Sequence, residues 1–186
     1  MLIIGITGTL GAGKGTIVNY LINNKGFQHL SVRSFLIDEI NKQGLEVNRD
    51  SMVVVANSLR AHNSPSFIID ELYKKAALSN QNCIIESIRT PGEVQSLRSK
   101  DNFILLAVDA DAHLRYERIL IRNSETDSIS FETFLENEKR EMDSSNPNNQ
   151  NIRECMKMAD HVFMNNGTVG ELEKSVEDYL QRIAGR

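Results

Sequence analysis

The segment Gly8-Thr9-Leu10-Gly11-Ala12-Gly13-Lys14-Gly15-Thr16 is the most informative part of the chain. It follows an apolar run, Leu2 to Ile6, that predicts a short buried strand, and it precedes a helical pattern of apolar residues from Ile17 to Ile22. Glycines let successive backbone N–H groups surround an anion, and the next helix adds the positive end of its dipole. Lys14 supplies a charge for the outer phosphates. We predict a phosphate-binding loop; the alternative is a glycine-rich turn that binds nothing.

One position departs from the general pattern of such loops. The hydroxyl residue that usually follows the lysine is replaced by Gly15, and the hydroxyl comes one place later, at Thr16. The order Gly-Lys-Gly-Thr resembles adenylate kinase and related nucleoside monophosphate kinases. That resemblance implies ATP and Mg²⁺ as cofactors, with the metal held largely through water molecules that a carboxylate on a later strand steadies.

Composition excludes several classes of function. The chain has 186 residues, 40% apolar and 25% charged, which is ordinary for one globular domain. Its net charge of −4 argues against a general attraction to nucleic acid or to an anionic membrane. No apolar run is long enough to span a bilayer, and Cys83 and Cys155 are far apart in the sequence. We expect a cytoplasmic protein, a monomer or homodimer, whose partner is a small-molecule nucleotide.

Short apolar runs alternate with amphipathic helices along the chain. This alternation predicts an α/β fold with a parallel sheet wrapped by helices. After the first strand, further strands are expected over residues 27–31, 83–87, 103–109 and 161–164. We predict a five-stranded P-loop kinase fold with strand order 2-3-1-4-5.

A long insertion separates the second and third expected strands. It shows three helical patterns, over residues 34–42, 50–62 and 66–78, with breaks at Gly44 and at Asn63-Ser64-Pro65. A direct crossover needs only one helix, so three predict a small acceptor-binding lobe. We therefore expect one domain, 1–186, with a core of 1–32 and 82–186, a helical insertion of 33–81 and a lid of about 123–130.

The third expected strand ends in Glu86-Ser87-Ile88-Arg89-Thr90-Pro91. A carboxylate at the carboxyl end of a buried parallel strand lies where α/β proteins bind ligands. Glu86 is suited to hold metal-bound waters there, and Arg89 to bind a phosphate with two donors. The alternative is a structural helix start, capped by Thr90 with Pro91 in the first turn.

Three arginines follow the fourth expected strand. Arg115, Arg118 and Arg122 are spaced i, i+3 and i+7 and share one helical face, which suits a polyanion or, as the alternative, a solvated basic surface. The polar segment to Ser130 and a charged helix over 131–142, with Lys139 and Arg140, are typical of a lid that excludes water from phosphates. A tight turn over Met164-Asn165-Asn166-Gly167-Thr168 is expected to lie beside the glycine loop and receive the base.

Further segments carry the resemblance. Glu86-Ser87-Ile88-Arg89 is similar to the adenylate kinase motif in which an acid precedes a monophosphate-binding arginine, and Glu117 to Arg122 resembles the segment that enters the lid. The segments 88–94 and 165–172 resemble a subgroup of archaeal adenylate-kinase-related proteins, dephospho-CoA kinase-like proteins and kinase-like domains joined to deoxycytidylate deaminases. The acceptor motif Ser-Thr-Gly-Asp-x-x-Arg of adenylate kinases is replaced by Ser31-Val32-Arg33-Ser34-Phe35-Leu36-Ile37.

Together, the residues and the resemblance imply a kinase that transfers the γ-phosphoryl group of ATP to a nucleoside or deoxynucleoside monophosphate. The alternatives are a dephospho-CoA kinase and a nucleotide-binding regulatory module without turnover. The residues expected to bind ATP are Gly8, Gly11, Ala12, Gly13, Lys14, Gly15, Thr16, Arg118, Asn166 and Gly167. Catalysis is assigned to Lys14, Arg89, Arg118 and Arg122, acceptor binding to Arg33, Arg60 and Arg89, and the metal to Glu86, through water, and Thr16.

Overall fold

The structure is a computed structural model that describes residues 1–100, 102–122 and 129–185. Most of the lid expected at 123–130 therefore lies outside the described residues. Cys83, which lies in an apolar run, is fully buried in the core.

A parallel sheet forms the centre of the described chain. Its strands are β1 (Ile3–Gly8), β2 (Gln28–Leu30), β3 (Cys83–Glu86), β4 (Phe103–Asp109) and β5 (His161–Met164). They lie in the order β2-β3-β1-β4-β5, so the predicted α/β fold and strand order are confirmed. β1 is buried along its whole length because it pairs with β3 on one side and with β4 on the other.

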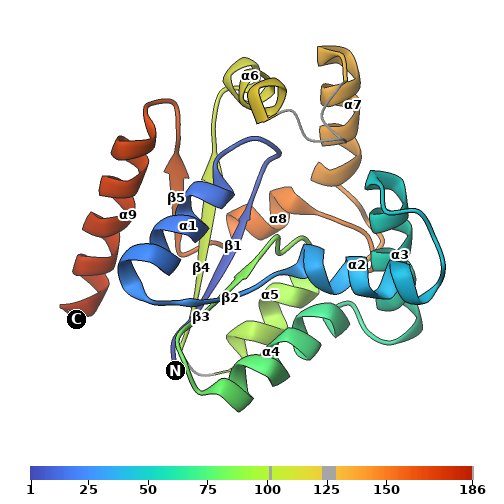
Figure 1. Ribbon diagram of the computed structural model, residues 1–186, viewed down its shortest axis with the longest axis horizontal. Helices are drawn as coiled ribbons and strands as arrows, with labels where there is room; N and C mark the ends of the chain where they lie inside the picture. The colour runs from blue at the N-terminus through green and yellow to red at the C-terminus, as the bar shows by residue number, and fades with distance from the viewer. Residues whose placement is uncertain (101, 123–128, 186) are drawn as a thin grey trace.

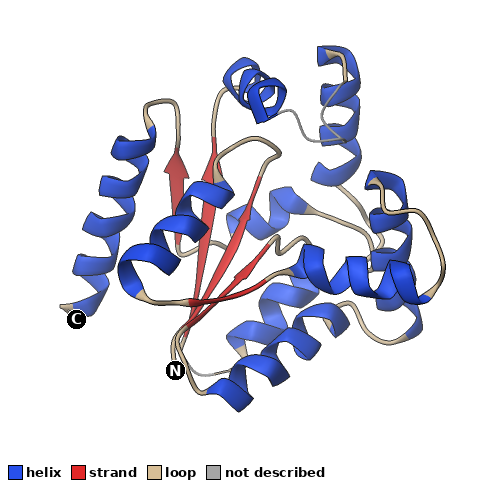
Figure 2. Cartoon of the chain, viewed as in Figure 1, coloured by secondary structure: helices blue, strands red, loops and turns tan. Residues whose placement is uncertain are grey.

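Helices cover both faces of the sheet (Figures 1 and 2). On one face, α1 (Lys14–Lys25) packs beside α9 (Val169–Ala184), and their apolar residues form a core with Ile4 and Ile6 of β1. On the other face, Ile3 belongs to a second core, formed among others with α2 (Val32–Lys42), α4 (Phe67–Ser79), α5 (Pro91–Arg98) and α8 (Ile152–Lys157). Neighbouring residues of β1 thus enter opposite cores, as the alternation of side chains along a strand requires.

The three helices expected between the second and third strands are present as α2 (Val32–Lys42), α3 (Arg49–His62) and α4 (Phe67–Ser79). Each lies within two residues of its predicted bounds at either end. Gly44, with a φ of +66°, follows α2 in the left-handed region, where glycine is the least strained residue. α2 packs on α3, and α4 packs against α5.

The remaining helices are α5 (Pro91–Arg98), α6 (Ala112–Arg122), α7 (Phe131–Met142) and α8 (Ile152–Lys157). α5 begins with the predicted Thr90 cap, and Glu93 completes a capping box. The short α8 was not anticipated; Asn151 caps it by accepting from the Glu154 N–H. No helix of the described residues combines the length and apolar character that crossing a membrane requires.

A buried ion pair joins α3 to the start of α5. The Arg60 and Glu93 side chains are each 1% exposed, and Arg60 donates to Glu93 Oε1 from Nε at 3.0 Å and from Nη2 at 2.7 Å. Glu93 Oε2 accepts the backbone N–H groups of Arg89 and Thr90 at 2.7 and 3.1 Å. One carboxylate therefore fixes both the helix that carries Arg60 and the loop that carries Arg89.

We predict that Glu93→Gln lowers the free energy of unfolding by about 3–5 kcal/mol, because it leaves the Arg60 charge buried without its counter-ion. Urea denaturation followed by circular dichroism measures the change. Glu71→Gln is the matched control, since Glu71 pairs with Lys74 at the surface and its loss should change stability little. Equal, small effects of both substitutions would contradict the prediction.

Candidate active site

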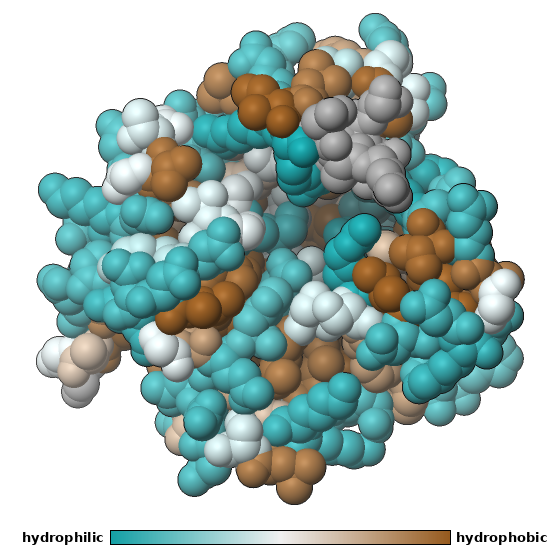
Figure 3. Space-filling view, in the orientation of Figure 1, coloured by the Kyte–Doolittle hydropathy of each residue, from teal (hydrophilic) through white to brown (hydrophobic). Residues whose placement is uncertain are grey.

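A cavity of about 720 Å³ opens at the carboxyl ends of β1 and β3. Its walls come from the glycine loop, α2, α3, the residues after β3, α6, the end of α7 and the turn between β5 and α9. In the space-filling view the molecule is hollowed at its centre, and hydrophilic side chains border much of the hollow (Figure 3). The cavity therefore lies at the edge of a parallel sheet where α/β folds bind ligands.

The glycine loop has a shape that side chains would prevent. Gly11 and Gly13 have φ values of +78° and +111°. A Cβ on Gly11 would lie 2.4 Å from the Arg115 carbonyl oxygen, and a Cβ on Gly13 would lie 2.5 Å from Asn165 Nδ2. Among the predicted ATP-binding residues of the loop, Gly11, Gly13, Lys14, Gly15 and Thr16 line the cavity. The other two predicted residues, Gly8 and Ala12, do not line the cavity. Ala12 is fully buried, and the Gly8 carbonyl accepts a hydrogen bond from Lys14.

Lys14 is folded back onto the loop. Its Nζ donates to the carbonyl oxygens of Gly8 and Thr9 at 2.8 and 2.7 Å. Burial, followed by the charge of Arg89, lowers the pKa of Lys14 from 10.5 to about 7. Arg122 also lowers this pKa, whereas Glu141 and Glu86 raise it. The protonated form of Lys14 therefore lacks sufficient negative charge around it, and an anionic ligand would supply that charge.

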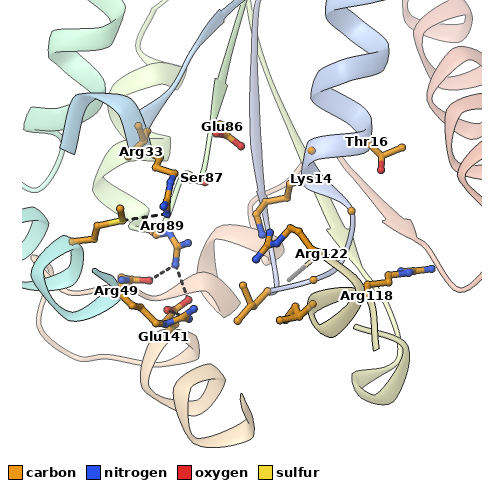
Figure 4. A pocket seen from close by; sticks show the side chains of 18 of the residues that line it. Lys14, Thr16, Arg33, Arg49, Glu86, Ser87, Arg89, Arg118, Arg122 and Glu141 are labelled. Atoms are coloured by element: carbon orange, nitrogen blue, oxygen red, sulfur yellow. Dashed lines mark hydrogen bonds and ion pairs between the residues drawn. The ribbon is translucent and has the colours of Figure 1, made fainter. Parts of the chain in front are cut away.

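Glu86 and Thr16 lie on the cavity wall as predicted for metal-associated residues (Figure 4). His29, whose Nε2 is 3.4 Å from Glu86 Oε1, holds the pKa of Glu86 below its usual value, and Lys14 acts in the same direction. Glu86 is therefore ionised at neutral pH. Thr16 Oγ1 and Glu86 Oε2 have no hydrogen-bond partner among the described residues. These oxygens fit Mg²⁺, which prefers oxygen ligands and retains several waters.

Arg89 lies on the far side of the cavity from Thr16 (Figure 4). Its Nη1 donates to Glu141 Oε2 at 2.6 Å and to Gln150 Oε1 at 2.5 Å. Arg49 of α3 donates from Nη2 to the other Glu141 oxygen at 2.5 Å. Burial raises the pKa of Glu141, but the charges of Arg89 and Arg49 overcome it and hold that pKa below its usual value. Glu141 is therefore a buried carboxylate anion.

The two other predicted acceptor residues differ in their surroundings. Arg33 is exposed at the cavity rim, where its Nη1 lies 3.4 Å from the Met52 sulfur. Arg60 lines the cavity, although Glu93 already neutralises it. Its Nη1 is buried and has no hydrogen-bond partner among the described residues. Arg60 thus has both a structural role and an unused donor.

The predicted arginines of α6 divide between several tasks. Arg118 lines the cavity and donates to the carbonyl oxygens of Asn165 and Gly167 at 2.9 and 3.2 Å. Arg122 also lines it, near Lys14 (Figure 4). Arg115 instead supports the loop from outside, with bonds to the Leu10 and Ala110 carbonyls and to Glu138.

The turn between β5 and α9 lies beside the glycine loop, as expected. Gly167 lines the cavity, while Asn166 accepts the Asp111 backbone N–H at 2.9 Å and thereby ties this turn to the start of α6.

The sequence did not predict Asn165, Arg49 or Glu141 as residues of this site, although all three line it. Asn165 is buried and donates from Nδ2 to the Ala12 carbonyl at 2.7 Å, which fixes the glycine loop from the far end of the chain. Its position within the predicted turn was the available signal. Arg49 and Glu141 are separated by 92 positions, and no local pattern reveals such a pair.

Comparisons with known proteins place the chain in two sequence families. A family model described as an AAA domain matches residues 4–146. A UPF0200 protein of Methanococcus vannielii is 30% identical to the chain, and the alignment covers 98% of this chain and 97% of the relative. The chain belongs to these families. UPF0200 protein PH1008 of Pyrococcus horikoshii is 26% identical, over 98% of this chain and 97% of its own.

Solved structures show the same fold at low sequence identity. TT1252 of Thermus thermophilus has a TM-score of 0.60 at 20% identity, over 97% of each chain. A gluconokinase of Sinorhizobium meliloti has a TM-score of 0.63 at 11% identity, over 99% of this chain and 94% of its own. A shikimate kinase of Aquifex aeolicus has a TM-score of 0.57 at 13% identity, over 98% of each. This UPF0200 family member therefore has a P-loop kinase fold.

We predict that a triphosphate binds with uptake of a proton. The pKa of Lys14 is about 7 without ligand, and a phosphate beside Nζ raises it, so Lys14 gains a proton on binding at about pH 8. Affinity should accordingly fall as pH rises above 7. Titration calorimetry of ATP in two buffers with different ionisation enthalpies measures the uptake.

Lys14→Arg is the control, because an arginine stays charged in both states and should show no uptake. The interpretation of Lys14 would be wrong if the unaltered chain took up no proton, or if Lys14→Arg took up as many.

Proposed function

We propose that this protein transfers the γ-phosphoryl group of ATP to the phosphate of a nucleoside or deoxynucleoside monophosphate, with Mg²⁺. One observation carries the proposal. A single cavity is bordered by the glycine loop with Lys14 on one side and by Arg89, Arg49 and the unused donor of Arg60 on the other. One group of cations suits the triphosphate of the donor, and the other suits the phosphate of the acceptor. The two groups face one cavity, where the donor and acceptor phosphates must come together for transfer.

The donor half has the parts that hold a triphosphate. The loop amides and the α1 N-terminus face the phosphates, and Lys14 exchanges its carbonyl partners for phosphate oxygens. Glu86, through water, and Thr16 would hold Mg²⁺, which would neutralise charge on the outer phosphates. Arg118 and the turn at Gly167 border the region for the base, and Arg122 stands near Lys14.

The acceptor half joins charge to an apolar surface. Val32, Leu36, Met52, Val53 and Ala56 of α2 and α3 line the cavity on the same side as the arginines. Such a wall suits the face of a flat base, while the arginines suit its phosphate. The α2–α4 helices therefore remain our candidate for an acceptor-binding lobe.

The proposed step needs no general base. An oxygen of the acceptor phosphate, already anionic, forms a bond to the γ-phosphorus while the bond from that phosphorus to the bridging oxygen breaks. The electron pair of the broken bond leaves with ADP. Catalysis then consists of positioning and of neutralising charge on the transferred group, tasks for Lys14, Arg89, Arg122 and the metal.

A hydroxyl acceptor is the second candidate, favoured by the ionised Glu86 on the cavity wall. A hydroxyl must lose a proton during transfer, and Glu86 is placed to accept one. Dephospho-CoA would be such an acceptor. Gluconate and shikimate belong to the same test, because a gluconokinase and a shikimate kinase share the fold.

The test is a coupled assay of ADP release with AMP, CMP, dCMP, dephospho-CoA, gluconate and shikimate in turn. We expect turnover with at least one monophosphate and a loss of about tenfold or more, on the order of 1.4 kcal/mol, in Lys14→Ala. Turnover only with a hydroxyl acceptor would contradict the proposal in favour of the second candidate. Binding of ATP without turnover on any acceptor would favour a regulatory nucleotide-binding protein.

Arg89 gives a sharper prediction. Arg89→Ala should raise the KM for the monophosphate strongly and leave the KM for ATP nearly unchanged, because loss of a paired, desolvated contact costs about 2–5 kcal/mol. Arg89→Lys should recover little, since an ammonium cannot form the planar fork. Initial-rate kinetics with each substrate varied in turn measure both constants.

Arg98→Ala is the control, because Arg98 pairs with Asp160 at the surface away from the cavity. Full activity of Arg89→Ala on a monophosphate would remove Arg89 from the acceptor site and leave it a structural residue at the start of α5.

A further inference from the structure

The Glu141 carboxylate occupies the centre of the arginine cluster in the acceptor half of the cavity. One oxygen accepts from Arg49 of α3 and the other from Arg89 after β3, so one anionic group bridges two cations from different parts of the chain (Figure 4). The Glu141 side chain is 10% exposed. A carboxylate that binds two guanidinium groups in this way has the charge and the oxygen spacing of part of a phosphate.

The cavity wall has more arginine donors than Glu141 uses. Arg49 Nε and Arg60 Nη1 are both buried, and neither has a hydrogen-bond partner among the described residues. Arg49 and Arg60 both line the cavity. Buried donors without partners are costly, and in a natural structure they call for an explanation. A ligand with more acceptor oxygens than a carboxylate would satisfy them.

We propose that Glu141 is an internal ligand of an anion subsite formed by Arg49 and Arg89, and that a phosphate monoester dianion binds there by displacing it. The subsite adds detail to the proposed function. It depends on that function only for the identity of the acceptor. Arg49 becomes an acceptor-binding residue, and Glu141 becomes a residue that determines specificity.

To displace Glu141, a ligand must carry at least as much negative charge as the carboxylate it replaces. A phosphate dianion brings twice the charge of the carboxylate and an additional oxygen, so it compensates the arginines and also reaches unused donors. A neutral hydroxyl compound cannot replace Glu141, because Arg49 and Arg89, both half-buried, would lose their counter-ion. The cluster should therefore favour phosphate-bearing acceptors and reject neutral sugars.

The experiment measures binding of inorganic phosphate by titration calorimetry in chains that all carry Lys14→Ala, which weakens binding at the glycine loop. Adding Glu141→Gln should tighten phosphate binding about tenfold, because a neutral amide competes poorly for two arginines. Glu141→Asp should also tighten it. The shorter side chain keeps its charge, and with it the folded state, but cannot span both arginines.

Glu138→Gln is the matched control. Glu138 lies on the same helix and pairs with Arg115, outside the cavity, so its replacement should leave phosphate affinity unchanged. Adding Arg89→Ala to the Glu141→Gln chain should abolish the gain. Thermal unfolding of each chain verifies folding, and Glu141→Asp decides the matter if Glu141→Gln does not fold.

Unchanged or weaker phosphate binding in the folded Glu141 variants would overturn the inference and make Glu141 a fixed structural counter-ion. The phosphate-binding result and the test of the proposed function can be told apart. A gain in phosphate affinity without turnover of any nucleoside monophosphate would contradict the function and support the subsite. Turnover of a monophosphate without that gain would support the function and contradict the displacement.

Discussion

The parallel pairing of β1 with β3 is the constraint on which the site depends. The register sets Ile6 beside Glu86, so the glycine loop that follows β1 and the charged segment that follows β3 emerge at the same edge of the sheet. Two further bonds lock this edge, from the Ile88 N–H to the Ile6 carbonyl at 3.1 Å and from Thr7 Oγ1 to the Ile88 carbonyl at 2.7 Å. Lys14 and Arg89 can therefore act on one ligand-filled space although they lie far apart in sequence.

The charges around the cavity are balanced unevenly. Glu93 neutralises Arg60 in the core, and Glu141 bridges Arg49 and Arg89. Among the described residues, however, Lys14 has only backbone carbonyls as direct partners. The low pKa of Lys14 and the unused donors of Arg49 and Arg60 have the same physical meaning. In each case folding removes water from a cationic group and replaces only part of the interactions that water made. Phosphate oxygens that enter the cavity would supply the missing interactions.

The sequence predicted the fold closely because its signals are local. Apolar runs and glycines defined the strands and the loop, and Thr90-Pro91 marked the start of α5. Four residues that the sequence predicted to bind ligands line the cavity: Glu86, Arg89, Arg118 and Arg122. They could be predicted because the ends of parallel strands meet at one edge of the sheet. It could not reveal that Arg60 pairs with Glu93, or that Glu141 bridges Arg49 and Arg89, because these pairs join residues 33 to 92 positions apart.

The most direct measurement is the affinity of a bisubstrate analogue, two nucleosides joined by five phosphates, by titration calorimetry. If one cavity holds a donor and an acceptor phosphate, the analogue should bind at least about tenfold more tightly than ATP. Lys14→Ala and Arg89→Ala should each weaken it, whereas Arg89→Ala should leave ATP binding almost unchanged. An analogue that binds no more tightly than ATP and is insensitive to Arg89→Ala would contradict the account.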